Sequence, residues 1–115
     1  MKVSISKYIA APGGGWEVMY RFMNSVLKEL EAFPLWKLKE NKATRQLKFE
    51  NYLSTVSFVN AVAYLAEKMN HHPDISFGYN TLEISYQTHD AGNQLTHKDL
   101  QAIASVEGLL QENHK

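Results

Sequence analysis

The chain has 115 residues, the size of one ordinary domain, and its 12 basic and 12 acidic side chains give a formal net charge of zero. Such a balance gives no net field that would favour nucleic acid or an anionic membrane, so we expect direct binding to neither. There are no cysteines, which excludes a disulfide framework, thiolate-ligated zinc and a cysteine nucleophile. No apolar segment has the length of a signal peptide or a membrane span, and we expect a cytoplasmic protein.

A proline followed by three glycines at residues 12–15 forms the first clear break in the chain, because these residues favour neither helix nor strand. We therefore predict an N-terminal arm over residues 1–15 and a single domain over residues 16–115. Between Met19 and Leu30, large apolar residues recur at steps of three and four. This period predicts a first helix over about 17–32, which Pro34 ends.

Two short apolar alternations follow the first helix. Trp36 and Leu38 alternate with lysines, and Leu47 and Phe49 alternate with polar residues. Residues 40–44 between them are polar, so the pattern predicts two strands joined as a hairpin.

A long apolar segment begins after Asn51, a residue that can cap a helix. Its apolar residues form one stripe with a second set beside it: Tyr52, Val56, Val59, Ala63 and Ala66, widened by Phe58, Val62, Leu65 and Met69. The pattern predicts a second helix that is the most buried element of the fold. Pro73 disfavours helical geometry at His72, so this helix should end at the histidine pair.

The remaining segments predict two more strands and a third helix. Apolar residues alternate over 75–79 and again over 82–86, and Thr96 with Asp99 three residues later is a capping-box pattern. The resulting order predicts an α+β domain with a four-stranded antiparallel sheet and helices packed on one face. Such a sheet has two edges, and we expect a homodimer or homotetramer.

Three of the five histidines stand at the ends of predicted elements: His71 and His72 after the second helix, and His89 after the fourth strand. Imidazoles titrate near neutral pH, so a cluster of them can both donate and accept protons. Two other readings remain open. The pair could be a polar helix terminus favoured by the helix dipole, or three imidazoles could hold a metal ion with a water.

The spacing of seven residues resembles the signature of the pterin-4a-carbinolamine dehydratase family: Glu67, His71, His72, Pro73, Tyr79, His89 and Asp99. The similarity extends from about Trp36 to Leu110 and includes the settings AEKMNHHPD and YNTLEISYQTHD. It implies a hydro-lyase that dehydrates 4a-hydroxytetrahydropterin to quinonoid dihydropterin. That step regenerates tetrahydrobiopterin for aromatic amino acid hydroxylases, and it needs the pterin substrate but no metal or redox cofactor.

The resemblance also implies roles for individual residues. His71 would donate a proton to the departing 4a-hydroxyl and His89 would act as the base near N5, or the two would be reversed. His72 would bind the pterin or orient the other histidines, and Pro73 would shape the floor. A second substrate-contacting stretch is implied at Thr88, His89, Asp90 and Ala91.

Some residues of the pattern have structural explanations as well. Asp99 could polarise a histidine or only cap the third helix, and Glu67 could belong to the site or be a solvated helix carboxylate. We expect Tyr79 to pack in the core or at an interface. Trp36 resembles an aromatic beside the family's pterin pocket, although its spacing to the second helix is shorter here.

The first 35 residues depart from the family's usual opening, which leaves the oligomeric arrangement open. The alternative function is a non-catalytic binding or dimerisation role on the same fold, as a transcriptional coactivator or an assembly factor. Retention of all three histidines favours catalysis, because a binding module would have no reason to keep them together.

Overall fold

The computed structural model describes residues 16–89, 92 and 94–113. In chain order the elements are α1 (Trp16–Leu30), β1 (Lys37–Lys39), β2 (Lys42–Lys48), α2 (Tyr52–Met69), β3 (Asp74–Phe77), β4 (Thr81–Tyr86) and α3 (His97–Asn113). This order and the antiparallel four-stranded sheet confirm the predicted α+β class. The predicted arm over residues 1–15 lies outside the described residues.

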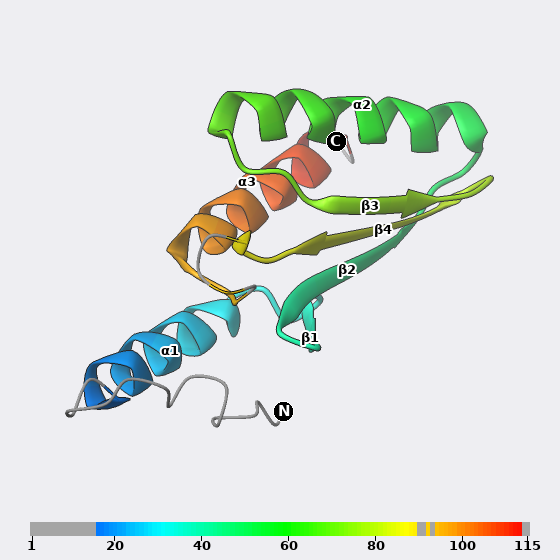
Figure 1. The fold of residues 1–115 in the computed structure, drawn as a ribbon. Helices are drawn as coiled ribbons and strands as arrows, with labels where there is room; N and C mark the ends of the chain where they lie inside the picture. The colour runs from blue at the N-terminus through cyan, green and yellow to red at the C-terminus, as the bar shows by residue number, and fades with distance from the viewer. Residues whose placement is uncertain (1–15, 90–91, 93, 114–115) are drawn as a thin grey trace.

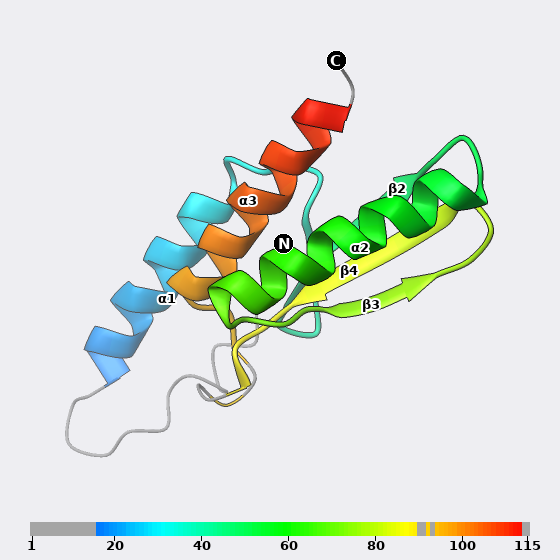
Figure 2. The same cartoon turned by 90° about the horizontal axis from the view of Figure 1, so that it is seen from above.

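The strands lie in the order β1-β2-β4-β3, and every neighbouring pair is antiparallel. Leu82, Ile84 and Tyr86 of the central strand β4 are fully buried and face the helices. Glu83 and Ser85, which alternate with them, belong to the opposite, polar face of the sheet, as the alternation predicted. Figures 1 and 2 show α2 running along the sheet, with α3 beside α2 and α1 beside α3.

The β1–β2 hairpin is tighter than the sequence suggested. Glu40 and Asn41 have φ values of 50° and 67°, so they form a two-residue turn of the kind whose twist matches the flanking strands. Ala43 and Thr44 are therefore strand residues, and both are buried. The predicted hairpin is confirmed, but the polar connection expected over residues 40–44 was too long. Thr44 is a polar residue inside the strand, and its hydroxyl forms a 3.0 Å hydrogen bond with that of Ser85.

Helix α2 is capped as predicted, because the Asn51 side chain accepts a hydrogen bond from the Ser54 amide at 2.8 Å. Its fully buried residues, however, match neither predicted set as a whole. Phe58 and Val62 come from the second set and Ala66 from the first, and Thr55 was in neither. Apolar residues surround so much of this helix that the period alone allowed either stripe. The most deeply buried element is β4, in which only Thr81 and Glu83 are not buried, so that prediction for α2 was wrong.

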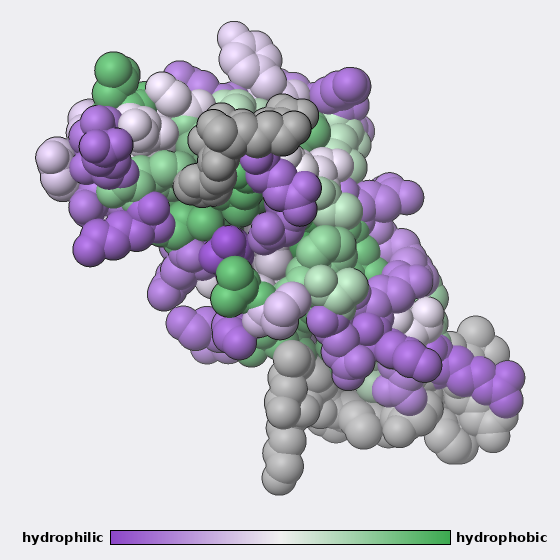
Figure 3. All heavy atoms as spheres, turned by 180° about the vertical axis from the view of Figure 1, so that it is seen from behind, coloured by the Kyte–Doolittle hydropathy of each residue, from purple (hydrophilic) through white to green (hydrophobic). Residues whose placement is uncertain are grey.

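Several large apolar side chains remain at the surface: Phe22, Leu35, Tyr52, Leu53, Tyr64, Phe77 and Tyr79. Tyr79 is 67% exposed, so of the two expected roles, core or interface packing, core packing was wrong and interface packing stays a prediction. Figure 3 shows polar and apolar residues interspersed on one face, with apolar side chains toward its middle. None of the described helices combines the length and apolar character needed to cross a membrane.

Candidate active site

Helix α2 ends just before the histidine pair. Asn70 has left-handed geometry, with φ 52° and ψ 42°, and its amide donates to the Glu67 carbonyl at 3.2 Å. The His71 amide donates to the Ala66 carbonyl at 3.1 Å, which completes a Schellman-type ending. The predicted end at the pair, attributed to Pro73, was therefore too late. Both histidines lie in the irregular connection to β3, where the 100° step of a helix does not separate them.

The three histidines line one pocket of about 330 Å³, with these residues: Asn70, His71, His72, Pro73, Asp74, Thr88, His89 and Lys98. The lining comes from the α2–β3 connection, the segment after β4 and the first turn of α3. Two larger hollows, of about 630 and 500 Å³, have no histidine in their linings. Asp90 and Ala91 of the predicted substrate-contacting stretch lie outside the described residues.

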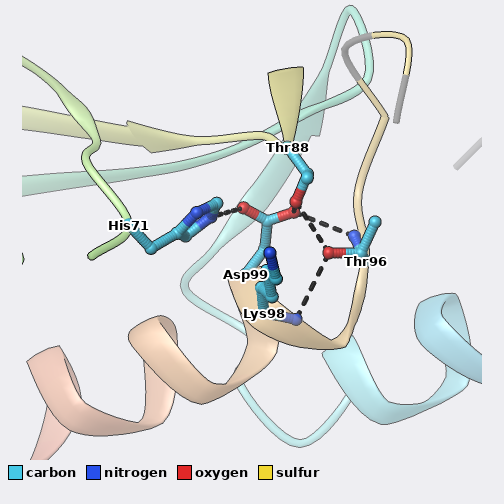
Figure 4. A network of polar contacts seen from close by, with 5 residues as sticks. All are labelled: His71, Thr88, Thr96, Lys98 and Asp99. Atoms are coloured by element: carbon cyan, nitrogen blue, oxygen red, sulfur yellow. Dashed lines mark hydrogen bonds and ion pairs between the residues drawn. The ribbon is translucent and has the colours of Figure 1, made fainter. Parts of the chain in front are cut away.

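Asp99 connects α3 to the pocket. Its side chain is 0% exposed, and Oδ1 lies 2.6 Å from Nε2 of His71 (Figure 4). The hydroxyl of Thr88 and the amide of Thr96 each donate to Oδ2 at 2.8 Å. A buried carboxylate requires such donors to replace its hydration. Capping the helix and contacting a histidine were treated as alternatives, and in the structure one side chain does both.

The hydrogen bonds around Asp99 run in one direction. The Lys98 amide donates to the Thr96 hydroxyl oxygen at 3.2 Å, and the hydroxyls of Thr96 and Thr88 lie 2.6 Å apart. Since Thr88 gives its proton to Asp99, its oxygen accepts the proton of Thr96. The ionised carboxylate can only accept, so the neutral His71 ring carries its proton on Nε2. Nδ1 is then the nitrogen that can exchange a proton with a ligand.

The face of the His71 ring lies against Tyr86. The two rings are stacked with centroids 5.7 Å apart and planes 12° apart. Burial, and second the charge of Asp99, raise the pKa of Tyr86 to about 12, so its phenol stays neutral. Sequence reasoning missed this neighbour of His71, because the alternation of β4 marks Tyr86 as a core residue and does not say what it touches.

Trp36 lies in the core beside Tyr86, at a centroid distance of 6.0 Å, and is not among the residues that line the pocket. Its indole N–H donates to Glu107 at 2.7 Å, and Arg45 donates to the same carboxylate oxygen at 3.0 Å. Trp36 thus contacts Tyr86, which in turn stacks on His71.

His72 is turned toward solvent and lies 2.8 Å from the Glu67 carboxylate, with the two side chains 57% and 77% exposed. An exposed pair of this kind is worth only about 0–1 kcal/mol. Glu67 is therefore a solvated carboxylate that also contacts a pocket residue. Three further lining residues, Asn70, Asp74 and Lys98, were not predicted; Lys98 could have been found from its place beside the capping residue Asp99.

The arrangement is suited to proton transfer. One imidazole is fixed by a buried carboxylate, and two others stand in the same pocket. Within the part of the chain that the structure describes, no group of three or more histidine, aspartate or glutamate side chains is placed to hold a metal ion. These features make the pocket a candidate acid–base site on a small α+β domain.

Comparison with known proteins places the chain in a family. The family model described as pterin 4 alpha carbinolamine dehydratase matches residues 21–109, and the chain belongs to that family. A relative from Acidobacterium capsulatum, provisionally named a pterin-4-alpha-carbinolamine dehydratase, is 40% identical over 86 residues, which cover 75% of this chain and 92% of the relative. Another with the same provisional name, from Nitrosomonas eutropha, is 41% identical over 86 residues, covering 75% and 74%.

Two solved structures share the fold. A protein from Brucella melitensis described as a transcriptional coactivator/pterin dehydratase has a TM-score of 0.68 at 25% identity, over 74% of this chain and 92% of that one. A pterin dehydratase-like protein identified as a RuBisCO assembly factor of the alpha-carboxysome has a TM-score of 0.56 at 23% identity, over 64% and 87%. At that identity the second similarity shows the fold alone.

Proposed function

We propose that this protein is a 4a-hydroxytetrahydropterin dehydratase that uses its histidines as general acid and base. The observation that carries the proposal is the 2.6 Å contact between Nε2 of His71 and buried Asp99, in a pocket that also contains His72 and His89. Family membership supports the reaction class, and the fixed imidazole supplies a group able to perform it.

The reaction removes water across the C4a–N5 bond of the substrate. The C4a–O bond breaks as the oxygen takes a proton from the acid, and a base removes the proton of N5. The C4a=N5 bond of the quinonoid dihydropterin forms from the electrons of the N5–H bond. Acid and base exchange protons with solvent afterwards, so each turnover releases one water with no net oxidation. Proton transfer of this kind contributes typically about 10² to 10⁴ in rate.

His71 is the acid in this proposal. When its ring is doubly protonated, Nε2–H points at the Asp99 carboxylate, which stabilises the positive charge, and Nδ1–H is the proton to be given. His89, which lines the same pocket from the segment after β4, is the base for N5. His72 and Pro73 lie beside His71 in the lining and bind the flat pterin ring. The catalytic groups are all side chains, so the reaction requires no cofactor besides the pterin itself.

The test is spectrophotometric decay of a 4a-hydroxytetrahydropterin with and without the protein. The parent should accelerate decay well above the spontaneous rate, and His71→Ala or His89→Ala should each remove most of that acceleration. His97→Ala is the matched control, since His97 contacts Glu29 of α1 at 3.2 Å and is not in the pocket lining. Parental rates in both site variants would refute the catalytic roles.

Failure of the parent itself to accelerate decay would favour the binding role. The observation behind that role is the exposed apolar surface of α2, where Leu53 is 75% and Tyr64 is 79% exposed. Co-purification of a partner with the parent, lost on replacing these two side chains by polar ones, would then establish it. The same dehydration assay tests whether tetrahydrobiopterin is the preferred pterin, by comparing the rates of substrates that differ in the side chain on C6.

A further inference from the structure

We propose that Tyr86 is a positioning residue: by stacking on His71 it sets the plane of the imidazole, and with it the direction in which Nδ1 can exchange a proton. The consequence for rate rests on the proposed function. The consequence for the His71 ring does not, and it can be measured separately.

The contact with Asp99 alone leaves the imidazole one degree of freedom. It fixes where Nε2 lies, at 2.6 Å from Oδ1, but it limits the tilt of the ring only weakly. The side-chain torsion that sets this tilt has broad minima in histidine. A second contact, on the face of the ring, is needed to define the plane.

Tyr86 supplies that second contact. Its ring is nearly parallel to the imidazole, at 12°, and the centroid separation of 5.7 Å is that of an offset stack. Tyr86 is 0% exposed and is the last residue of the strand β4, so it cannot move aside without opening the core. The His71 side chain is itself only 12% exposed, so little of its surface lies outside these two contacts and the pocket.

Tyr86 also packs against a second aromatic residue of the core. The ring of Trp36 lies at a centroid distance of 6.0 Å, and its indole donates a 2.7 Å hydrogen bond to Glu107. Tyr86 therefore contacts both Trp36 and His71, and Arg45 pairs with the same glutamate at 3.0 Å. Tyr86 comes from β4, Arg45 from β2 and Glu107 from α3, and Trp36 directly precedes β1, so the backing of His71 is built mainly on regular elements.

The ring of Tyr86, and not its hydroxyl, makes these contacts. The buried Oη atom has no hydrogen-bond partner among the described residues. Phenylalanine should therefore reproduce the positioning effect, whereas leucine keeps the site apolar and removes the stack. This contrast separates positioning from any chemistry of the phenol.

The experiment compares Tyr86→Phe, Tyr86→Leu and the control Phe58→Leu, which removes a buried ring from the core below α2. The ring nitrogens of His71 are observed by ¹⁵N NMR well below the unfolding transition. The parent and Tyr86→Phe should show sharp signals of one tautomer, protonated on Nε2. Tyr86→Leu should keep this tautomer, because Asp99 is unchanged, but its signals should be broadened or shifted by exchange between ring tilts, while Phe58→Leu leaves them unchanged.

Kinetics follow on the same variants. Misplacement of a reacting group by a fraction of an ångström to 1 Å can cost up to about 10²-fold in rate, so Tyr86→Leu should lower kcat about 10- to 100-fold with little change in KM. Unaltered His71 signals in Tyr86→Leu, or the same change in Phe58→Leu, would overturn the proposal. If the parent lacks dehydratase activity, the proposed function fails, and the NMR comparison still decides the role of Tyr86.

Discussion

Replacing Asp99 by asparagine should stop the reaction while leaving the protein folded. The side chain has the same shape, but one carboxylate oxygen becomes an NH₂ group. The Thr96 amide can only donate, and it lies 2.8 Å from Oδ2, so the remaining oxygen must occupy that position. The NH₂ group is then directed at Nε2 of His71, where it can only donate.

The consequence for His71 is a change of tautomer. Nε2 must accept from the amide, so the neutral ring carries its proton on Nδ1, and a doubly protonated ring would place two donors face to face. The acid form of His71 is therefore lost. A carboxylate-to-amide change that imposes the wrong tautomer costs about 10⁴ in kcat in the best-known case, and loss of acid–base assistance costs about 10² to 10⁴. We expect kcat to fall within this range, which corresponds to about 3 to 5 kcal/mol in the activation free energy.

Stability should fall much less. Asparagine still accepts a hydrogen bond from the Thr96 amide. The free energy of unfolding should fall by about 1 to 2 kcal/mol, because neutral hydrogen bonds replace charge-assisted ones. Stopped-flow decay of the 4a-hydroxypterin measures kcat, and urea denaturation measures stability. Glu83→Gln is the control, because it makes the same chemical change on the open face of the sheet, where Glu83 contacts Gln46. A folded Asp99→Asn protein with parental kcat would refute the assignment of His71 as the acid.

Three further substitutions test separate parts of the structure. Thr88→Val removes a 2.8 Å hydrogen bond to Asp99, and it should lower the free energy of unfolding by about 1 to 2 kcal/mol and kcat about tenfold. Thr88→Ser, which keeps the hydroxyl, should restore both. An unchanged kcat in Thr88→Val would show that Asp99 does not need this donor. Tyr86 has its pKa raised from 10.0 to about 12, so between these pH values the unfolded state binds fewer protons than the folded state and stability falls as pH rises, by up to about 2 to 3 kcal/mol. Tyr86→Phe should lack this part of the alkaline loss in urea titrations from pH 9 to 12, and equal slopes in both proteins would contradict the burial of the phenol. Asn51→Ala removes the cap of α2 and should cost about 1 kcal/mol in thermal unfolding with kcat unchanged; a fall in kcat would show that the start of α2 affects the site.

The types and order of the elements could be predicted because each has a strong local signal. Apolar periods marked the helices and strands, and Asn51 and Thr96 marked the starts of α2 and α3 through the chemistry of capping. The two boundaries that were wrong, at residues 40–44 and at the end of α2, share one cause. Glu40, Asn41 and Asn70 adopt positive φ, a conformation that residues other than glycine adopt rarely and that composition marks weakly.

The site was predictable where spacing along the chain carries the information. His71, His72 and His89 stand at element ends, and the structure brings all three to one pocket. Tyr86 could not be found in this way. An alternating strand shows which side chains are buried, but the partner of a buried ring depends on the register of the sheet and the path of the chain after α2.

The double use of Asp99 explains how His71, in a short connection, can be held in a defined position. Capping requires Oδ2 to face the Thr96 amide, so the backbone of α3 fixes the carboxylate, and Oδ1 is directed at His71 as a result. The start of α3 therefore sets the geometry of the contact between Asp99 and His71. Substitutions that shift Thr96 must also shift Oδ1 relative to Nε2, so stability and kcat should fall together at Thr96 and Asp99. At Asn51, which caps a different helix at the far end from the pocket, stability alone should change.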